Sequence, residues 1–365
     1  MPLRVGVLFG GQSAEHAVSM MSAYAVMEAI GRSYEIVPIA IDHNGHWIAG
    51  EAALKLMTSE MGRAPSLPAQ DSLRLSSLPH PESEHLPMAF RPESLTGLVD
   101  VVIPILHGPM GEDGTVQGLL ELADLPYVGS GVLGSALGMD KIAMKIMLGA
   151  AGIPQVGYQG ITRYSWGHEA RQTLDTLEQN LPYPMFVKPA NLGSSVGISK
   201  AANRAALEIA IDQAQRFDHR VIVEECVDAR EFEVGILGWE EAQASVVGEL
   251  RVRGHQFYDY QAKYQDTATE FIIPANIPVH VAQQMRELAV KSFHALDCAG
   301  LARVDFFWDR LSERVFLNEI NTLPGFTAYS MYPLLWEATG VPYVTLLDRL
   351  IQIAMERYRQ HPRHQ

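Results

Sequence analysis

The first 41 residues alternate between two kinds of pattern, and this alternation limits the folds open to the chain. A β-rich run over residues 3–9 ends at Gly10-Gly11, and a helical stretch follows over residues 14–30. Ser13 is placed to cap that helix. Further β-rich runs cover residues 34–41 and 99–106. Strands that alternate with helices predict an α/β fold whose N-terminal domain holds a doubly wound parallel sheet.

The size and charge of the chain narrow the classes of protein to which it can belong. A chain of 365 residues is long enough for two or three domains, and 47% hydrophobic with 19% charged residues is globular composition. The net charge of −14 argues against non-specific nucleic-acid binding. Two cysteines suit a reducing cytoplasm. We find no secretory signal and no run of about 18 apolar residues, so we expect a cytoplasmic protein without a membrane span.

Three domains are expected. Residues 1–130 form the N-terminal α/β domain, with a surface insertion at 50–96 that we expect to have little regular structure, because six of the 21 prolines lie between Pro65 and Pro92. Residues 131–227 form a central α+β unit that opens with one helix over 132–150. Residues 228–365 form a C-terminal α+β domain, with β-like runs at 232–237, 270–273, 301–308 and 314–320 and a helix at 279–296.

The strongest chemical signal is a pair of strands near the C-terminus. Arg303 and Asp305 lie two residues apart, as do Glu319 and Asn321. Side chains two apart on a strand share one face. The carboxylate and amide oxygens are hard ligands that suit Mg²⁺ held between protein and phosphate. The alternative is two ordinary amphipathic strands, each with one solvated polar face.

Two glycine-containing turns are candidate binding loops. Residues 191–197 follow Lys188, which could neutralise phosphate charge, and the glycines expose backbone N–H groups that can cradle phosphate. A flexible hairpin loop is the competing interpretation. At the N-terminal turn, Glu15 could accept an ammonium group, although on these residues alone complementation of the helix dipole by an acidic residue is the favoured explanation. His107 ends a strand at the edge where open α/β sheets bind ligands, or it is a structural histidine.

A third candidate loop runs from residue 251 to 269. It is polar, contains glycine and concentrates large or cationic side chains between Phe257 and Tyr264, including Lys263. Long loops of this kind inside a compact domain are usually lids or binding loops, and disorder is the alternative.

Together these motifs resemble the D-alanine–D-alanine ligase family of ATP-grasp enzymes. Seven motifs occur in the family's order, and the resemblance covers the chain outside residues 50–96. Ala17 departs from the glutamate that relatives often carry. The motifs are residues 10–19 (GGQSAEHAVS), 107–114 (HGPMGEDG), 187–189 (VKP), 193–197 (GSSVG), 257–264 (FYDYQAKY), 302–305 (ARVD) and 318–326 (NEINTLPGF).

The resemblance implies an ATP-grasp fold with ATP gripped between the central and C-terminal domains, two Mg²⁺ or Mn²⁺ ions, D-alanine as substrate and a homodimer. It also implies roles for individual residues. The implied nucleotide contacts are Lys141, Lys188, Glu224, Glu225, Cys226, Val227 and Glu231, and the implied metal ligands are Asp305, Glu319 and Asn321. The implied catalytic and substrate groups are Glu15, Ser194, Arg303, Gly325 and Tyr264, with His107, Ser330 and Lys263.

Three other functions are weighed against a ligase of two D-alanines. A ligase for D-lactate or D-serine is the nearest, and Tyr264 argues against D-lactate because depsipeptide-forming relatives tend to carry Phe there. A nicotinamide-dependent reductase would need G-x-G-x-x-G after the first strand, and the third glycine is missing. A catalytically dead ATP-binding regulator would need a lost metal ligand or phosphate lysine, and all of these residues are present.

Overall fold

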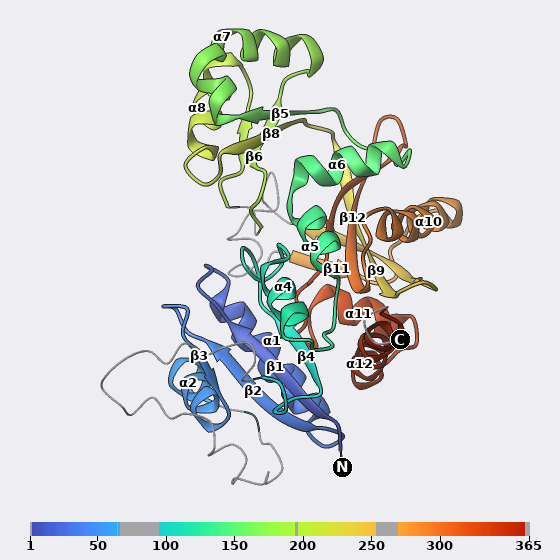
Figure 1. Cartoon of the computed structure of the whole chain (residues 1–365). Coiled ribbons are helices and arrows are strands. Elements are labelled where there is room, and N and C mark those ends of the chain that lie inside the picture. The colour runs from blue at the N-terminus through green and yellow to red at the C-terminus, as the bar shows by residue number, and fades with distance from the viewer. Residues whose placement is uncertain (1, 64, 66–94, 194–195, 253–268, 362–365) are drawn as a thin grey trace.

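The computed structural model contains three β-sheets, each with its own helices (Figure 1). It describes residues 2–63, 65, 95–193, 196–252 and 269–361. Among them, no helix is long and apolar enough to cross a membrane.

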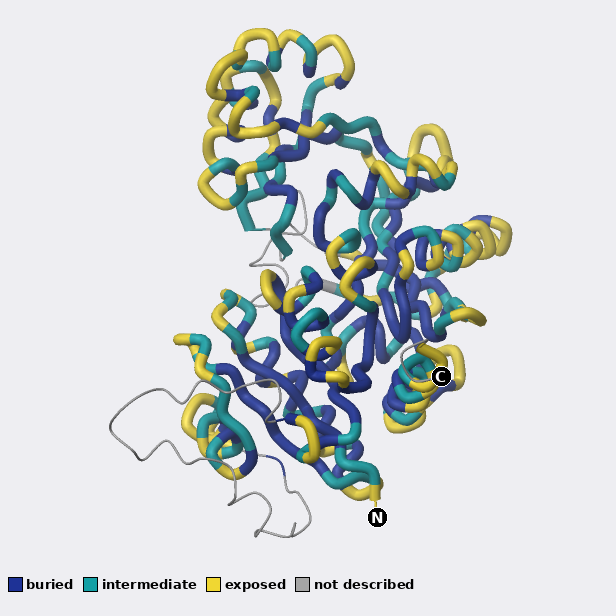
Figure 2. Tube along the Cα trace, viewed as in Figure 1, coloured by how far each residue is buried: buried dark blue, intermediate teal, exposed yellow. Residues whose placement is uncertain are grey.

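The N-terminal sheet has the strand order β3-β2-β1-β4. β1 (Arg4–Gly10) pairs in parallel with both β2 (Glu35–Ile41) and β4 (Val101–Ile105), which confirms the predicted parallel sheet. The edge strand β3 (Trp47–Ala49) is antiparallel to β2, so the sheet is mixed. The three parallel strands are almost wholly buried, as Figure 2 shows, because helices cover both faces.

Alternate residues of β1 enter two different cores. Val5, Val7 and Phe9 pack with α1 (His16–Ile30), α2 (Glu51–Met61) and the C-terminal helix α12 (Tyr343–Gln360), whereas Leu8 packs on the face of α4 (Thr115–Leu122). Helices therefore lie on both faces of this sheet.

Two expectations for this domain are wrong. The first helix begins at His16 rather than at residue 14, and no side chain among the described residues caps it. The Ser13 hydroxyl lies before the helix, where it donates to the His107 carbonyl and accepts from Glu15 N. Residues 51–61, expected to be irregular, form α2, since Ala53 and Met57 give the helix an apolar side that is buried against the sheet. The proline-rich residues 66–94 lie outside the described part.

The central sheet is antiparallel, with the order β5-β8-β6-β7. Helices α7 and α8 pack on it around a separate core, seen at the top of Figure 1. The bounds are β5 (Tyr158–Thr162), α7 (Arg163–Asn180), β6 (Met185–Pro189), β7 (Ser199–Ala201), α8 (Arg204–Ala214) and β8 (Arg220–Glu225).

The C-terminal sheet is also antiparallel, in the order β11-β10-β9-β12-β13. It includes β10, a strand absent from the sequence-based expectation. Helix α10 packs into a hydrophobic core with β9, β12 and β13, and α11 packs against β9 and β10. The bounds are β9 (Ala229–Gly238), β10 (Gln243–Val252), β11 (Thr269–Ile272), α10 (Val279–Ala295), β12 (Gly300–Asp309), β13 (Val315–Asn321) and α11 (Met331–Ala338).

The single helix expected over 132–150 is two helices, α5 (Val132–Met139) and α6 (Lys141–Ala150). They are separated by Asp140, whose backbone is extended and whose side chain accepts hydrogen bonds from Ile142 N and Ala143 N. A strong N-cap at this point begins a new helix in a new direction. Met144 and Leu148 of α6 lie in the core of the C-terminal sheet, so α6 packs with that sheet.

Candidate active site

Two adjoining cavities lie between the three sheets. One, of about 400 Å³, is lined mainly by the N-terminal and C-terminal parts of the chain and includes Glu15 and Ser330. The other, of about 540 Å³, lies between the central and C-terminal sheets and includes Lys188 and Glu231. Both cavities are lined by the same six residues where they meet, namely Lys141, Gly193, Glu233, Leu250, Arg303 and Glu319.

The polar pairs on the two C-terminal strands lie side by side. In the antiparallel pairing of β12 with β13, Arg303 is opposite Asn321 and Asp305 is opposite Glu319. The alternation of each strand puts these side chains on one face, and buried Val304 and Ile320 on the other, as expected. The polar face lines the cavities rather than bulk solvent, so the interpretation as two ordinary solvated strands is not supported.

Arg303 is held by two carboxylates at the junction of the cavities. Its Nε lies 2.8 Å from Asp305 Oδ1 and 3.0 Å from Glu233 Oε2, and its Nη2 donates to Asp305 Oδ2 at 2.8 Å. Burial alone would lower the pKa of Arg303, but the negative charges of Asp305 and Glu233 outweigh it and raise that pKa. The guanidinium is therefore a fixed positive charge.

The lysines of the second cavity form a chain of charges. Glu224 bridges two buried ammonium groups, with Lys188 Nζ at 2.6 Å and Lys145 Nζ at 2.8 Å. Burial would raise the pKa of Glu224, but the two lysines outweigh it and lower that pKa to about 2. Lys141 Nζ donates to the Leu192 carbonyl at 2.8 Å and lies 3.7 Å from Glu319 Oε2. Positive charge therefore lines the cavity near the carboxylates of β12 and β13.

The end of β8 and the start of β9, with the residues between them, form another wall of this cavity. Glu224, Glu225, Cys226, Val227 and Glu231 all line it. The Glu225 carboxylate accepts from Gly157 N at 2.7 Å, and Cys226 N donates to the Pro184 carbonyl at 3.1 Å. These bonds fix the backbone of the wall.

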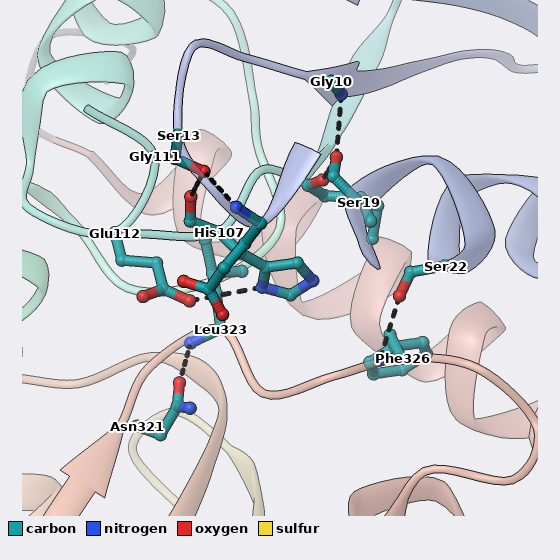
Figure 3. A network of polar contacts seen from close by, with 12 residues as sticks. Gly10, Ser13, Ser19, Ser22, His107, Gly111, Glu112, Asn321, Leu323 and Phe326 are labelled. Carbon is teal, nitrogen blue, oxygen red and sulfur yellow. Dashed lines mark hydrogen bonds and ion pairs between the residues drawn. The ribbon is translucent and has the colours of Figure 1, made fainter. Parts of the chain in front are cut away.

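Glu15 and His107 meet in the first cavity, near the carboxyl ends of β1 and β4. Ser13 joins the two loops, because its hydroxyl donates to His107 O at 2.7 Å (Figure 3) and accepts from Glu15 N at 3.2 Å. Gly108 has φ +76°, and a Cβ there would lie 3.1 Å from Glu15 Oε2. Glycine at 108 therefore leaves room for the Glu15 carboxylate.

The carboxylate of Glu112 lies next to the His107 ring. Its Nδ1 lies 3.3 Å from Glu112 Oε1 (Figure 3). Burial would lower the pKa of His107, but Glu112, and further off Glu15, raise it. The histidine is buried and lines the cavity, which favours a place in the site over a remote structural role.

The opposite wall of the first cavity is the turn after β13. Gly325 and Ser330 both line the cavity. Thr327 N donates to Ser330 Oγ at 3.1 Å, and a Cβ on Gly325 would lie 3.3 Å from the same oxygen. The Asn321 side-chain oxygen accepts from Leu323 N at 3.1 Å, which shapes the start of this turn (Figure 3).

Three of the expected site residues lie outside the described part of the chain. Ser194 belongs to residues 194–195, and Lys263 and Tyr264 belong to residues 253–268. Their expected roles, and the expected lid, stay predictions.

Two family models match the chain in sequence. The model described as "D-ala D-ala ligase N-terminus" matches residues 4–130, and "D-ala D-ala ligase C-terminus" matches residues 147–352. The chain belongs to the D-alanine–D-alanine ligase family. The resemblance inferred from the seven motifs is therefore confirmed.

Relatives in this family match over nearly the whole chain. The D-alanine–D-alanine ligase of Geobacillus thermodenitrificans is 47% identical over 99% of this chain and 97% of its own. The D-alanine–D-alanine ligase of Heliobacterium modesticaldum is 45% identical over 100% of this chain and 98% of its own. Among solved structures, the Coxiella burnetii D-alanine–D-alanine ligase has a TM-score of 0.78 at 32% identity, over 99% and 96%. The D-Ala:D-Ser ligase VanG of Enterococcus faecalis has a TM-score of 0.79 at 33% identity, over 97% of this chain and 100% of its own.

Sequence reasoning missed three groups in this ligase-family site: Lys145, Glu233 and the pairing of Glu112 with His107. Lys145 follows Lys141 by four residues, so both lysines lie on one side of α6. Glu233 follows Glu231 by two residues on β9, where residues two apart share a face. Both spacings were visible in the sequence, but the partners, Glu224 and Arg303, come from other strands.

Proposed function

We propose that this chain joins two D-alanines into D-alanyl-D-alanine at the expense of ATP, as a step in peptidoglycan precursor synthesis. The observation that carries the proposal is the junction of the two cavities. A nucleotide in one and an amino acid in the other would meet beside Lys141, Arg303 and Glu319, which line both. Membership of the ligase family supplies the reaction class.

The nucleotide would occupy the larger cavity. Lys141 and Lys188 would neutralise its phosphates, and Glu224 to Val227 with Glu231 would receive the adenosine part. Asp305, Glu319 and Asn321 fit divalent cations, because they are hard oxygen donors grouped on one face beside these lysines. Bound Mg²⁺ or Mn²⁺ would supply charge neutralisation and alignment for the transferred phosphoryl group.

Activation of the first D-alanine is the first chemical step. Its carboxylate attacks the γ-phosphorus, the bond to the β-phosphate oxygen breaks, and an acyl phosphate and ADP result. This transfer requires positioning more than covalent help from the protein. Glu15 would orient the ammonium group, since its carboxylate lines the cavity next to His107.

Attack by the second amino acid completes the reaction. Its ammonium group loses one proton, the resulting amine adds to the acyl carbon, and negative charge develops on the acyl oxygen. The nitrogen then loses a second proton as the oxyanion collapses to the amide and inorganic phosphate leaves. Arg303 is suited to stabilise that oxyanion, because its charge is fixed by Asp305 and Glu233 and is therefore already in place. The Gly325 N–H would be the second donor, and Ser330 would anchor the entering carboxylate.

Product analysis tests the proposal and its nearest alternatives together. ATP hydrolysis is followed with D-alanine alone, L-alanine alone, and D-alanine with either D-serine or D-lactate, and each product is identified by mass. We expect rapid ADP formation with D-alanine and D-alanyl-D-alanine as the main product. A main product containing D-serine or D-lactate would reassign the second substrate. ATP turnover independent of D-alanine would overturn the ligase proposal.

We also infer a homodimer that acts in the cytoplasm. The family resemblance supports the dimer, and the presence of only two cysteines supports a reducing compartment. Light scattering coupled to gel filtration measures the mass in solution, and a mass of one chain, 40.3 kDa, would contradict the dimer.

A further inference from the structure

A second cluster of metal-ligating side chains lies outside the proposed active-site cavities, in the N-terminal domain. His16, His43 and Glu60 each present a ligand atom, and these atoms all lie within 4.8 Å of one another. Within the described residues, no other group of three or more His, Cys, Asp or Glu meets this condition. We propose that the cluster is a transition-metal site with Zn²⁺ as its preferred ion.

The three ligands come from three separate segments. His16 begins α1, His43 lies in the turn between β2 and β3, and Glu60 lies in the last turn of α2. The end of β1 allows this approach. Gly10 has φ +91°, and a Cβ there would lie 2.2 Å from Ile41 O and 3.2 Å from His16 Cε1. The absence of a side chain at Gly10 therefore lets the His16 ring pack against the end of β2.

The tautomer of His16 favours metal binding. Its Nδ1 lies 2.6 Å from the Gly11 carbonyl, which can only accept, so Nδ1 carries the hydrogen. Nε2 then faces Glu60 Oε2 at 2.9 Å. Two atoms that both carry lone pairs approach this closely only when a proton or a metal ion lies between them. A histidine whose second nitrogen donates to a carbonyl is the usual arrangement in metal sites.

His43 supplies the third ligand. Its Nε2 lies 3.9 Å from Glu60 Oε1, and its ring stacks on that of His16 with centroids 3.8 Å apart. The side chain is 64% exposed, so it can tilt toward a shared ion without disturbing the core. Two imidazoles and one carboxylate with an open fourth position are a common zinc set, and imidazole favours Zn²⁺, Ni²⁺ and Cu²⁺ over Mg²⁺.

A metal ion here would fasten the loop that carries Glu15. His16 is the next residue along the chain, and His43 and Glu60 would tie it to the β2–β3 turn and to α2. The site is thus suited to stabilise the N-terminal domain beside the first cavity. The ligands themselves are outside both cavities.

Binding of Co²⁺ and Zn²⁺ to the full chain tests this inference. Metal-free protein is titrated with Co²⁺, followed by its visible absorption, and then with Zn²⁺ by calorimetry, in excess Mg²⁺ and without nucleotide. We expect one Zn²⁺ per chain, an intense Co²⁺ spectrum typical of low coordination number, and a melting temperature raised by Zn²⁺. His43→Ala and Glu60→Gln should each weaken Zn²⁺ binding about tenfold or more, because loss of even an outer partner has that effect.

His46→Ala is the matched control. His46 lies on the same turn, is also exposed, and pairs with Asp42 rather than with the cluster. It should bind Zn²⁺ as the unaltered protein does. Equal binding by the His43, Glu60 and His46 variants would mean adventitious metal on surface groups, and no Zn²⁺ binding by the unaltered protein would mean that only a proton bridges His16 and Glu60. Either result overturns the inference.

Discussion

At the residue scale, the site is built from charges that hold one another in place. Arg303 is fixed by Asp305 and Glu233, and Glu224 is fixed by Lys145 and Lys188. Glu224, Lys145 and Glu233 are buried and the others are largely shielded from water, so removal of one partner leaves the other poorly compensated. We therefore expect substitution of a side chain that faces a cavity to lower mainly the activity. Substitution of one that faces a charged partner should lower mainly the stability.

Glu319→Gln should abolish most turnover and leave the fold intact. The substitution is nearly isosteric and removes negative charge where the cavities meet. We expect kcat to fall by about 3–5 kcal/mol of transition-state stabilisation, with an unchanged melting curve. Glu287→Gln, on an exposed turn of α10, is the control for loss of one charge. Near-normal turnover of Glu319→Gln would remove Glu319 from the metal site.

Glu224 should give the protein a specific sensitivity to acid. Its folded pKa of about 2 lies below the usual value of 4.5, so its contribution is present above pH 4.5 and declines as the pH falls toward 2. The shift corresponds to about 3 kcal/mol. Urea unfolding from pH 6 downward should show a shallower loss of stability in Glu224→Gln than in the unaltered protein. An identical slope would contradict this, and exposed Glu208→Gln should change neither slope nor stability.

At the element scale, the sequence predicted most strands and helices of the fold. It did not predict elements whose bounds depend on contacts with distant segments of the chain. The β-rich runs with polar side chains two residues apart predicted β12 and β13, and the register of the two strands brings their polar faces together. The sequence did not reveal that Asp140 would split the helix expected over 132–150, because Asp140 is fixed by Arg220 and Asn191 from other segments. Nor did it reveal α2, whose apolar side is short.

Asp140→Ala should weaken both stability and nucleotide binding. The Asp140 side chain caps α6, whose first residue is Lys141. Loss of a cap costs about 0.5–2 kcal/mol, and Lys141 would no longer be held against Leu192. We expect a lower urea midpoint and a raised KM for ATP. Asp140→Asn keeps a capping oxygen and should retain more of the stability and more of the affinity for ATP. A raised KM for D-alanine alone would contradict this account.

At the scale of the whole molecule, the site depends on all three sheets, and no single stretch of sequence contains it. Glu15 and His107 come from loops that follow strands of the N-terminal sheet, Lys188 from the central sheet, and Arg303 from the C-terminal sheet. Motif order could predict that these residues belong together, since the family resemblance spans the chain. It could not predict their pairing, such as that of Lys145 with Glu224, because charge partners depend on how the sheets pack.

Replacement of residues 66–92 by a short Gly/Ser linker should leave ligase activity within several-fold. This stretch lies outside the described residues, whereas Pro65 and Leu95 on either side are buried and should be kept. Loop length alone changes the free energy of unfolding little. Steady-state kinetics and gel filtration measure the outcome. Loss of soluble protein would show that the replaced stretch is needed for packing or assembly.

The position of α12 has a consequence for biosynthesis. This helix packs Leu346, Leu350 and Ile351 into the same core as β1, the first strand of the chain. Translation delivers β1 long before α12. Until α12 leaves the ribosome, the part of this face that α1 and α2 do not cover stays open to water and to chaperones. The nascent chain therefore has to wait for α12 before this core is complete.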